Sequence, residues 1–549
     1  MRKSGFIEGA FIATLVIFIV KVLGIVYIIP FYSMVGMKGS ILYGYAYSIY
    51  AIFLSLSTSG IAIAISRTVS EYNALGFFNL KERIYKLAAT LIISLGIICF
   101  FVLIIFAPHL ARIILGELRG GNTIEEVTMV IRLISLAFLI VPVFSVTKGY
   151  LQGHRFIYLT SMATLLEQVV RVAIITFGSF VLIKGMGYNI EVGVGAAVVG
   201  ASMGAVVAYG YLLRKIKKHR KDLLRDELPS AEEKAVTNKQ LILRIITYAM
   251  PFVFIDVFKS GLYLVDTLTV VRTMVSLGQS EIAEVTLGIM NSLGNKLNMI
   301  IISISMGITI SLIPNISASY AKKNYADINL KINQTLQALI FIGLPMTLGI
   351  YFLVQPVWII FYSYDPLSIT IFKLYVFQAI IFSVFSVLVN TFQIMNNTKY
   401  ALGTVIAVVV FKSLLNIPMM KLFDSLSWPL YYSSILLTMI IQISAIIFLI
   451  VMLTKKYNFN ILKQYKNFVK TFVIVAIMMI VLKIANLFIP IAELNKLGAI
   501  REVFIFSVIG TIIYLWVSFK SGLVYDVFGK RIVDKIILNI NKNIVLFKK

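Results

Sequence analysis

The chain has 549 residues, of which 59% are hydrophobic and only 13% are charged. A soluble protein carries about 25% charged residues, so this composition excludes an ordinary soluble enzyme and indicates a membrane protein. The formal net charge of +26 would suggest nucleic-acid binding in a soluble chain. Here the basic residues fall mostly in alternate breaks between apolar runs, which is a topology signal, and we expect no nucleic-acid partner.

Fourteen apolar runs follow one another along the chain, and each is long enough to cross a ~30 Å hydrocarbon layer. The first run is too long for the apolar part of a cleavable signal peptide and lacks a small-residue cleavage site. The pattern predicts an all-α polytopic membrane protein. Its transmembrane helices are expected near 6–34, 41–66, 83–107, 127–150, 156–183, 190–213, 242–274, 285–313, 333–361, 370–394, 400–420, 430–453, 468–490 and 499–519.

The breaks after even-numbered spans are basic, and the longest of them carries a run of Lys and Arg between 214 and 225. The break after the seventh span has no basic residue but holds Glu281 and Glu284. Because cytoplasmic loops are enriched in Lys and Arg, both termini are predicted to be cytoplasmic. The expected location is a bacterial cytoplasmic membrane, crossed many times.

An internal repeat divides the chain. The segment that begins at Gly60 recurs at Gly307, and the Phe-Ser-Val string at Phe144 recurs at Phe385. Spans one to six therefore resemble spans seven to twelve in the same order, which predicts two lobes related by an axis along the membrane normal. The expected parts are an N-terminal lobe at 1–213, a basic linker at 214–241, a C-terminal lobe at 242–453, a helix pair at 468–519 and a basic cytoplasmic tail at 520–549.

Several ionisable side chains lie inside the predicted spans, where each costs at least ~2.5–3.5 kcal/mol. Lys21 lies too deep in span one to reach either surface. Span seven places Asp256, Lys259, Tyr263 and Asp266 on one stripe of the helix. Pairing of Asp256 with Lys259 alone would also explain two of these charges. Both interpretations stay open at this stage.

Other spans add to this set. Glu167 and Arg171 are four residues apart in span five, and asparagines form a polar face on span eight. Basic residues exceed acidic ones, which favours an anionic cargo such as a phosphate or pyrophosphate. The predicted cavity residues are Lys21, Arg67, Lys148, Glu167, Arg171, Asp256, Lys259, Asp266, Arg272, Asn291, Asn295 and Lys412. The single cysteine, Cys99, indicates neither a disulfide framework nor a metal site.

Three strings, which run over 21–26, 64–76 and 148–154, resemble the polysaccharide-exporter branch of the MOP superfamily, and most closely its MurJ and SpoVB types. The resemblance covers essentially the whole chain. It implies a V-shaped cavity lined by basic residues, with spans thirteen and fourteen forming a groove for a lipid tail. It also implies that the protein moves an undecaprenyl-pyrophosphate-linked saccharide to the outer leaflet. For MurJ-type members that cargo is the peptidoglycan precursor lipid II.

The chain departs from the family pattern at the predicted site. Lys21 stands where MurJ-type proteins have an arginine, and Tyr27 stands where they have a second one. The paired arginines of span two are missing. These departures leave another lipid-linked unit, such as one for teichoic acid, capsule or spore envelope, open as the cargo.

We expect alternating access between the two lobes, with no hydrolysis, no metal and no cofactor. Coupling to membrane potential or to a monovalent ion stays open. The expected partners are the lipid-linked oligosaccharide, membrane lipids and, as an open class, cell-wall synthesis proteins, and the expected oligomeric state is a monomer. A multidrug or cation antiporter of the same superfamily, a membrane glycosyltransferase and a non-transporting scaffold are the alternatives.

Overall fold

The computed structural model describes residues 16, 19–116, 121–154, 156–218, 231–303, 316, 324–395, 397–460, 465–491 and 495–528. In these residues every regular element is a helix, which confirms the predicted fold class. The chain groups into two compact units. Unit 1 comprises Met1–Asn295 with Val405–Leu437, and unit 2 comprises Lys296–Thr404 with Thr438–Lys549.

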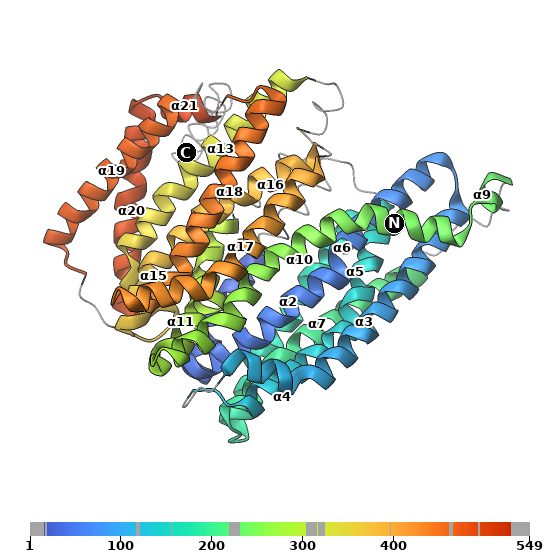
Figure 1. Cartoon of the computed structure of the whole chain (residues 1–549), viewed down its shortest axis with the longest axis horizontal. Coiled ribbons are helices and arrows are strands. Elements are labelled where there is room, and N and C mark those ends of the chain that lie inside the picture. The colour runs from blue at the N-terminus through green and yellow to red at the C-terminus, as the bar shows by residue number, and fades with distance from the viewer. Residues whose placement is uncertain are drawn as a thin grey trace, which may run out of the picture. The chain divides into compact units, whose positions relative to one another are not determined.

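Unit 1 holds the helices in which all the predicted cavity residues lie. Figure 1 shows several of them, α2, α3, α5, α7 and α10, running beside one another. In chain order its elements are α2 (Ile28–Leu75), α3 (Phe78–Leu115), α4 (Ile124–Ser135), α5 (Ala137–Gly153), α6 (Ile157–Ala173), the π-helical turns η1 (Ile174–Gly178) and η2 (Val181–Gly185), α7 (Ile190–Lys218), α9 (Ala231–Ala235), α10 (Asn238–Ser276), α11 (Ser280–Asn291), most of α17 (Thr398–Ser425), η3 (Leu430–Tyr432) and the start of α18 (Ser433–Tyr457).

Unit 2 contains the rest of α17 and α18 and the C-terminal helices. There α19 packs against α20, and both contact α13. Its own elements are α13 (Tyr325–Phe352), α14 (Val354–Phe361), α15 (Pro366–Tyr375), α16 (Phe377–Ile394), α19 (Tyr465–Phe488), α20 (Lys496–Lys520) and α21 (Leu523–Phe528).

Twelve helices in the described part of the chain are long and apolar enough to cross a membrane. They correspond to twelve of the predicted spans. The expected spans near 6–34 and 285–313 lie partly outside the described residues, as do most of the basic tail and part of the linker. The end of span one and all of span two fall within α2, and Gly36 has a φ of +63° where we predicted the break between them.

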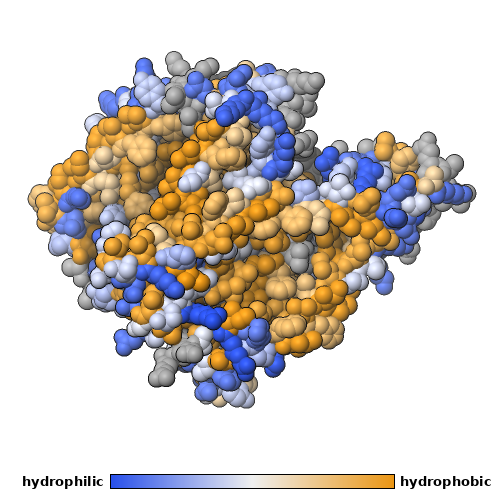
Figure 2. Space-filling model, viewed as in Figure 1, coloured by the Kyte–Doolittle hydropathy of each residue, from blue (hydrophilic) through white to orange (hydrophobic). Residues whose placement is uncertain are grey.

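The exposed faces of the helices are apolar. In α3, one face is buried along its length, from Ile84 through Cys99 to Ala107. The opposite face is hydrophobic too, since Ile98 is 58% exposed and Ile105 is 65% exposed. A helix that is hydrophobic on all sides is typical of a membrane span. Figure 2 shows hydrophobic residues over the long helices and hydrophilic residues gathered near helix ends.

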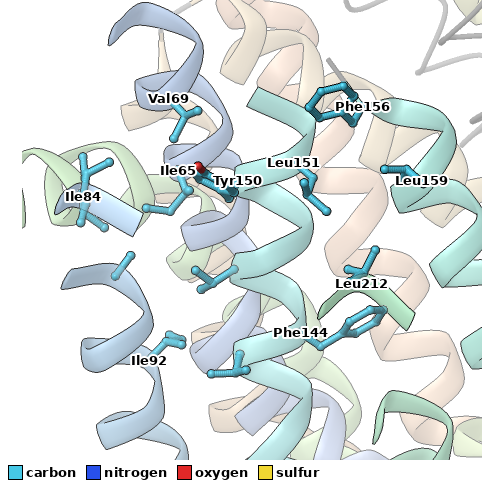
Figure 3. Close-up of a cluster of buried hydrophobic side chains, with 14 of the residues drawn as sticks. Ile65, Val69, Ile84, Ile92, Phe144, Tyr150, Leu151, Phe156, Leu159 and Leu212 are labelled. Atoms are coloured by element: carbon cyan, nitrogen blue, oxygen red, sulfur yellow. The ribbon is translucent and has the colours of Figure 1, made fainter. Parts of the chain in front are cut away.

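A buried apolar cluster holds unit 1 together near the ends of α2 and α5. Figure 3 shows Ile65 and Val69 of α2 facing Tyr150 and Leu151 of α5, with Ile84 of α3 on the other side. Burying an aliphatic side chain of this size contributes ~1.5–3 kcal/mol in water. Within a membrane, close packing supplies more of the stabilisation than water exclusion does. Small residues are therefore needed where helices cross.

Gly149 is such a residue. A Cβ atom placed there would lie closer to the carbonyl oxygen of Ala62 in α2 than van der Waals contact allows. We expect Gly149→Ala to lower the free energy of unfolding by ~1–3 kcal/mol through overpacking, measured as a lower melting temperature of the purified protein in detergent. The matched control is Gly210→Ala in α7, because nothing lies within 4 Å of its added Cβ. Equal melting temperatures for the two variants would contradict this packing argument.

Candidate functional site

All twelve predicted cavity residues lie in unit 1, but the structure does not gather them into one group. They form three clusters, and two residues lie at helix ends. Helix α10 carries residues of two of these clusters and extends from Arg244 in its second turn to Arg272 near its last. At 1.5 Å per residue, the 28 residues between them span roughly 42 Å along the helix.

The first cluster, called the Arg171 cluster, joins α5 and α6. Nη2 of Arg171 lies 2.6 Å from Oε1 of Glu167, and both side chains are mostly buried. The Lys148 ammonium lies 4.4 Å from the centre of the Phe144 ring and interacts electrostatically with both Glu167 and Arg171. The i,i+4 ion pair predicted in span five is therefore present, and Lys148 is added to it.

Close helix packing fixes the position of the Arg171 cluster. A Cβ atom at Gly204 of α7 would lie 2.6 Å from the Glu167 carbonyl oxygen, so only glycine lets α7 approach α6 here. On another side, a Cβ atom at Gly24 would lie 3.6 Å from Nε2 of Gln168. Lys21 lies three residues before Gly24, is partly buried, and makes interactions within the structure. The helical segment 19–26, which carries Lys21, therefore runs beside α6 at Gln168, the residue next to Glu167.

A row of tyrosines that the sequence analysis missed faces Arg171. The Arg171 guanidinium interacts electrostatically with Tyr43, Tyr47 and Tyr50 of α2. The Tyr43 and Tyr47 rings stack with their centres 6.0 Å apart, and the Tyr50 ring lies 5.8 Å from that of Tyr47. Among the described residues, the Tyr50 hydroxyl and Nε of Arg171 are buried without a hydrogen-bond partner. The spacing of these tyrosines at i, i+4 and i+7 was a readable signal of one helix face.

The second cluster, called the Asn291 cluster, joins α10 to the eighth span. Nδ2 of Asn291 donates to the Tyr263 carbonyl oxygen at 3.2 Å and to Oγ1 of Thr267 at 2.7 Å. The Tyr263 hydroxyl donates to Oδ1 of Asn295 at 3.5 Å. Earlier on α10, Asp256 and Lys259 interact electrostatically. The asparagine face therefore contacts the polar stripe of α10, a pairing that the sequence analysis did not predict.

The third cluster, called the Lys412 cluster, lies among α10, α17 and α18. Nζ of Lys412 is 2.5 Å from Oδ2 of Asp266, and the Ser434 hydroxyl donates to Oδ1 of Asp266 at 2.6 Å. The side chains of Lys412 and Asp266 are 1% and 5% exposed. One turn along, Nδ2 of Asn416 donates to Oγ1 of Thr269 at 2.6 Å. Asp266 thus pairs with Lys412 and Ser434, whereas Tyr263 hydrogen-bonds with Asn295, so the stripe predicted on span seven meets different partners along its length.

The remaining two predicted residues lie at opposite ends of the helices. Arg67 is 61% exposed at the end of span two, with Nε 3.3 Å from Oε1 of Glu71. Arg272 is exposed near the last turn of α10, where its Cγ lies beside Gly116. Neither side chain contacts the other clusters in the described residues.

The net positive charge of the predicted cavity is reduced by pairing. Two of its cations, Arg171 and Lys412, form close ion pairs with carboxylates. In the part of the chain that the structure describes, no three His, Cys, Asp or Glu side chains are placed to hold a metal ion. The Arg171 cluster contains two cations, Arg171 and Lys148, and one carboxylate, Glu167. With Lys21 on a neighbouring helical segment, it remains the most cationic group among the predicted cavity residues.

Unit 2 contains an apolar groove of about 450 Å³. It lies among α13, α14, α19 and α20, and its walls include Phe341, Pro345 and Met478. Tyr514 closes part of it, because its hydroxyl donates to the Phe341 carbonyl oxygen at 2.6 Å. A groove of this lining accepts hydrocarbon far better than a charged group.

Two family models match the chain. The model described as "Polysaccharide biosynthesis protein" matches residues 6–320, and the MatE model matches residues 251–420. Among curated proteins, the Bacillus subtilis "Lipid II flippase MurJ" is 32% identical over 96% of this chain and 98% of its own length. "Stage V sporulation protein B" from the same organism is 22% identical, over 62% of this chain and 64% of its own length.

Solved structures share the fold. A structure described as "Lipid II flippase MurJ, inward closed conformation" has a TM-score of 0.67 at 15% identity and covers 94% of this chain and 99% of its own. An inward-facing multidrug resistance MATE transporter of the MOP superfamily has a TM-score of 0.63 at 12% identity, covering 79% of this chain and 95% of its own. At such low identity these two matches establish the fold alone.

Proposed function

Because this chain belongs to the polysaccharide-exporter branch of the MOP superfamily, among its MurJ-type members, we propose that it is a lipid II flippase of the bacterial cytoplasmic membrane. The observation that carries the proposal is the 32% identity to a lipid II flippase over 96% of the chain. The cargo would move from the inner to the outer leaflet by alternating access of two lobes, 1–213 and 242–453, joined by the linker at 214–241.

Each part of the cargo has a chemically suitable counterpart in one of the units. A pyrophosphate suits the cationic Arg171 cluster, to which Lys21 adds a third positive charge on a neighbouring helical segment. The prenyl tail suits the apolar groove between α13, α14 and the helix pair at 468–519. Burying a methylene group is worth ~0.8 kcal/mol, so a long tail makes a large contribution to binding.

The reaction would be a movement without bond cleavage. We propose that no residue acts as a catalyst, that no cofactor takes part, and that the protein works as a monomer. Moving one net charge across 100 mV is worth ~2.3 kcal/mol. We propose that transport is coupled either to this potential or to a monovalent ion.

Depletion of the protein in its own host is the test of this function. Lipid II is expected to accumulate in the inner leaflet, where an outer-leaflet enzyme or probe cannot reach it, while total lipid II does not fall. Lipid-linked teichoic-acid precursors are expected to stay unchanged. Normal sidedness of lipid II together with a change in another precursor would reassign the cargo, and no change in any lipid-linked precursor would reject the flippase function.

A cation or multidrug antiporter is the second candidate, because the MatE model matches residues 251–420. Its expected signature is uptake or extrusion of a cationic dye by proteoliposomes under an ion gradient. The basic character of the Arg171 cluster is unsuited to a cationic cargo, since like charges repel at close range. We therefore expect no gradient-dependent dye movement.

A further inference from the structure

One carboxylate near the ends of α2 and α10 is shared by two arginines. Nη2 of Arg244 lies 2.5 Å from Oε2 of Glu71, and Nε of Arg67 lies 3.3 Å from the other oxygen, Oε1. Each carboxylate oxygen thus meets a different guanidinium. We call Arg67, Glu71 and Arg244, with their aromatic neighbours Tyr72 and Tyr248, the Arg244 cluster.

Tyrosine rings hold both guanidinium groups in place. The Arg67 guanidinium lies 4.7 Å from the centre of the Tyr248 ring. The Arg244 guanidinium lies 5.0 Å from the Tyr72 ring and 5.6 Å from the Tyr248 ring, and it donates to the Tyr72 hydroxyl at 3.1 Å. Cation–π contacts of this kind attract a guanidinium to the face of the ring and stabilise its position. The two arginines are therefore positioned by aromatic contacts as well as by Glu71.

The Arg244 cluster is accessible and carries excess positive charge. The side chain of Arg67 is 61% exposed, that of Arg244 35% and that of Glu71 32%. Solvent-accessible ion pairs contribute little to stability, so replacing the Glu71 carboxylate by another anion would cost little. Each guanidinium can also bind a phosphate through two parallel N–H groups, so two of them facing one anion suit a phosphate well.

The position of the Arg244 cluster favours a lipid phosphate as the anion that it binds. Arg67 follows directly after span two, and α10 begins at Asn238 after the basic linker. The predicted topology places both at the inner surface of the membrane, where lipid phosphates lie. The Arg244 cluster is also separate from the Lys412 cluster, since Arg244 and Asp266 are roughly 33 Å apart along α10 at 1.5 Å per residue.

We propose that Arg67 and Arg244 form an entry site for the phosphate headgroup of an anionic lipid, and that Glu71 occupies this site as an internal competitor in the conformation described here. The headgroup belongs either to the pyrophosphate-linked cargo, which rests on the proposed function, or to a bulk anionic phospholipid. In both cases the incoming phosphate exchanges with the carboxylate, and no covalent bond is made or broken.

The test measures lipid binding to the purified full-length protein in detergent, with undecaprenyl pyrophosphate and phosphatidylglycerol as separate probes. Glu71→Gln is expected to tighten binding about two- to five-fold, because it removes a competitor of surface ion-pair strength. Arg244→Gln is expected to weaken binding. The matched control is Glu82→Gln, which removes the same charge from an exposed pair with Lys86 at 2.9 Å in α3. It is expected to bind like the wild type.

The two probes separate the possible sources of the phosphate. An effect on undecaprenyl pyrophosphate assigns the site to the cargo, and an effect on phosphatidylglycerol alone assigns it to membrane lipid. Equal affinities of the Glu71→Gln and Glu82→Gln variants for both probes would overturn the entry site, as would full binding by Arg244→Gln. The flippase function is tested separately, by the sidedness of lipid II after depletion. A failed entry site and a failed flippase function are therefore distinguished by different measurements.

Discussion

Replacing Lys412 with methionine is expected to lower the free energy of unfolding by ~3–5 kcal/mol, because the substitution leaves a buried carboxylate without its counter-ion. The Lys412 ammonium lies 2.5 Å from Oδ2 of Asp266, and the two side chains are 1% and 5% exposed. Ser434 donates to the other carboxylate oxygen, but a neutral hydroxyl does not balance a full charge. Methionine retains the apolar length of lysine, so the change tests the charge rather than the packing.

The double variant Asp266→Asn with Lys412→Met makes this prediction specific. Removing both charges of a buried pair is often neutral, so most of the lost stability is expected to return. The measurement is the melting temperature of each purified variant in detergent. Lys86→Met at an exposed pair serves as the control and is expected to change stability by less than ~0.5 kcal/mol. A Lys412→Met variant that melts with the wild type, or a double variant no more stable than the single one, would reject a structural role for the pair.

Hydropathy predicted the helices well because membrane thickness sets their length. The run at 83–107 appears as α3 and the run at 242–274 as α10, each extended by a few residues at its ends. Hydropathy did not predict two features of the structure. The helix after Arg171 contains the π-helical turns η1 and η2, which depend on local hydrogen-bond geometry and not on hydropathy. The compact units also differ from the predicted lobes, since α10 packs along α2 and falls into unit 1.

The sequence identified many residues of the candidate site, but it did not show which of them contact one another. Charges inside spans stand out because they are costly, and this drew attention to Asp266 and Lys412. Their contact joins residues 146 positions apart, and only the packing of α10 against α17 and α18 reveals it. Arg244 lies only two residues inside the predicted span at 242–274, where a charge costs little, so it was not singled out. Tyrosines carry no charge, so a search for charged side chains inside spans passed over the row that faces Arg171.

Lys21 gives the second large expected effect. We expect Lys21→Ala to abolish growth of cells that depend on this protein, and Lys21→Arg to support growth. The reason is its place on the helical segment that runs beside α6 next to Glu167, where an anionic headgroup would need positive charge. Losing one desolvated charge contact costs ~2–5 kcal/mol, which is about 30-fold or more in affinity. The measurement is complementation of a depleted strain, with each variant expressed in the membrane at the level of the wild type.

The control is Lys86→Ala, which removes a lysine whose side chain is 71% exposed and should complement fully. Growth with Lys21→Ala would show that its charge only balances neighbouring helices. Loss of growth with both Lys21→Ala and Lys21→Arg would indicate that shape, and not charge alone, is required at this position. Growth with Lys21→Arg but not with Lys21→Ala would show that a positive charge, carried by either residue type, is what this position supplies to the anion.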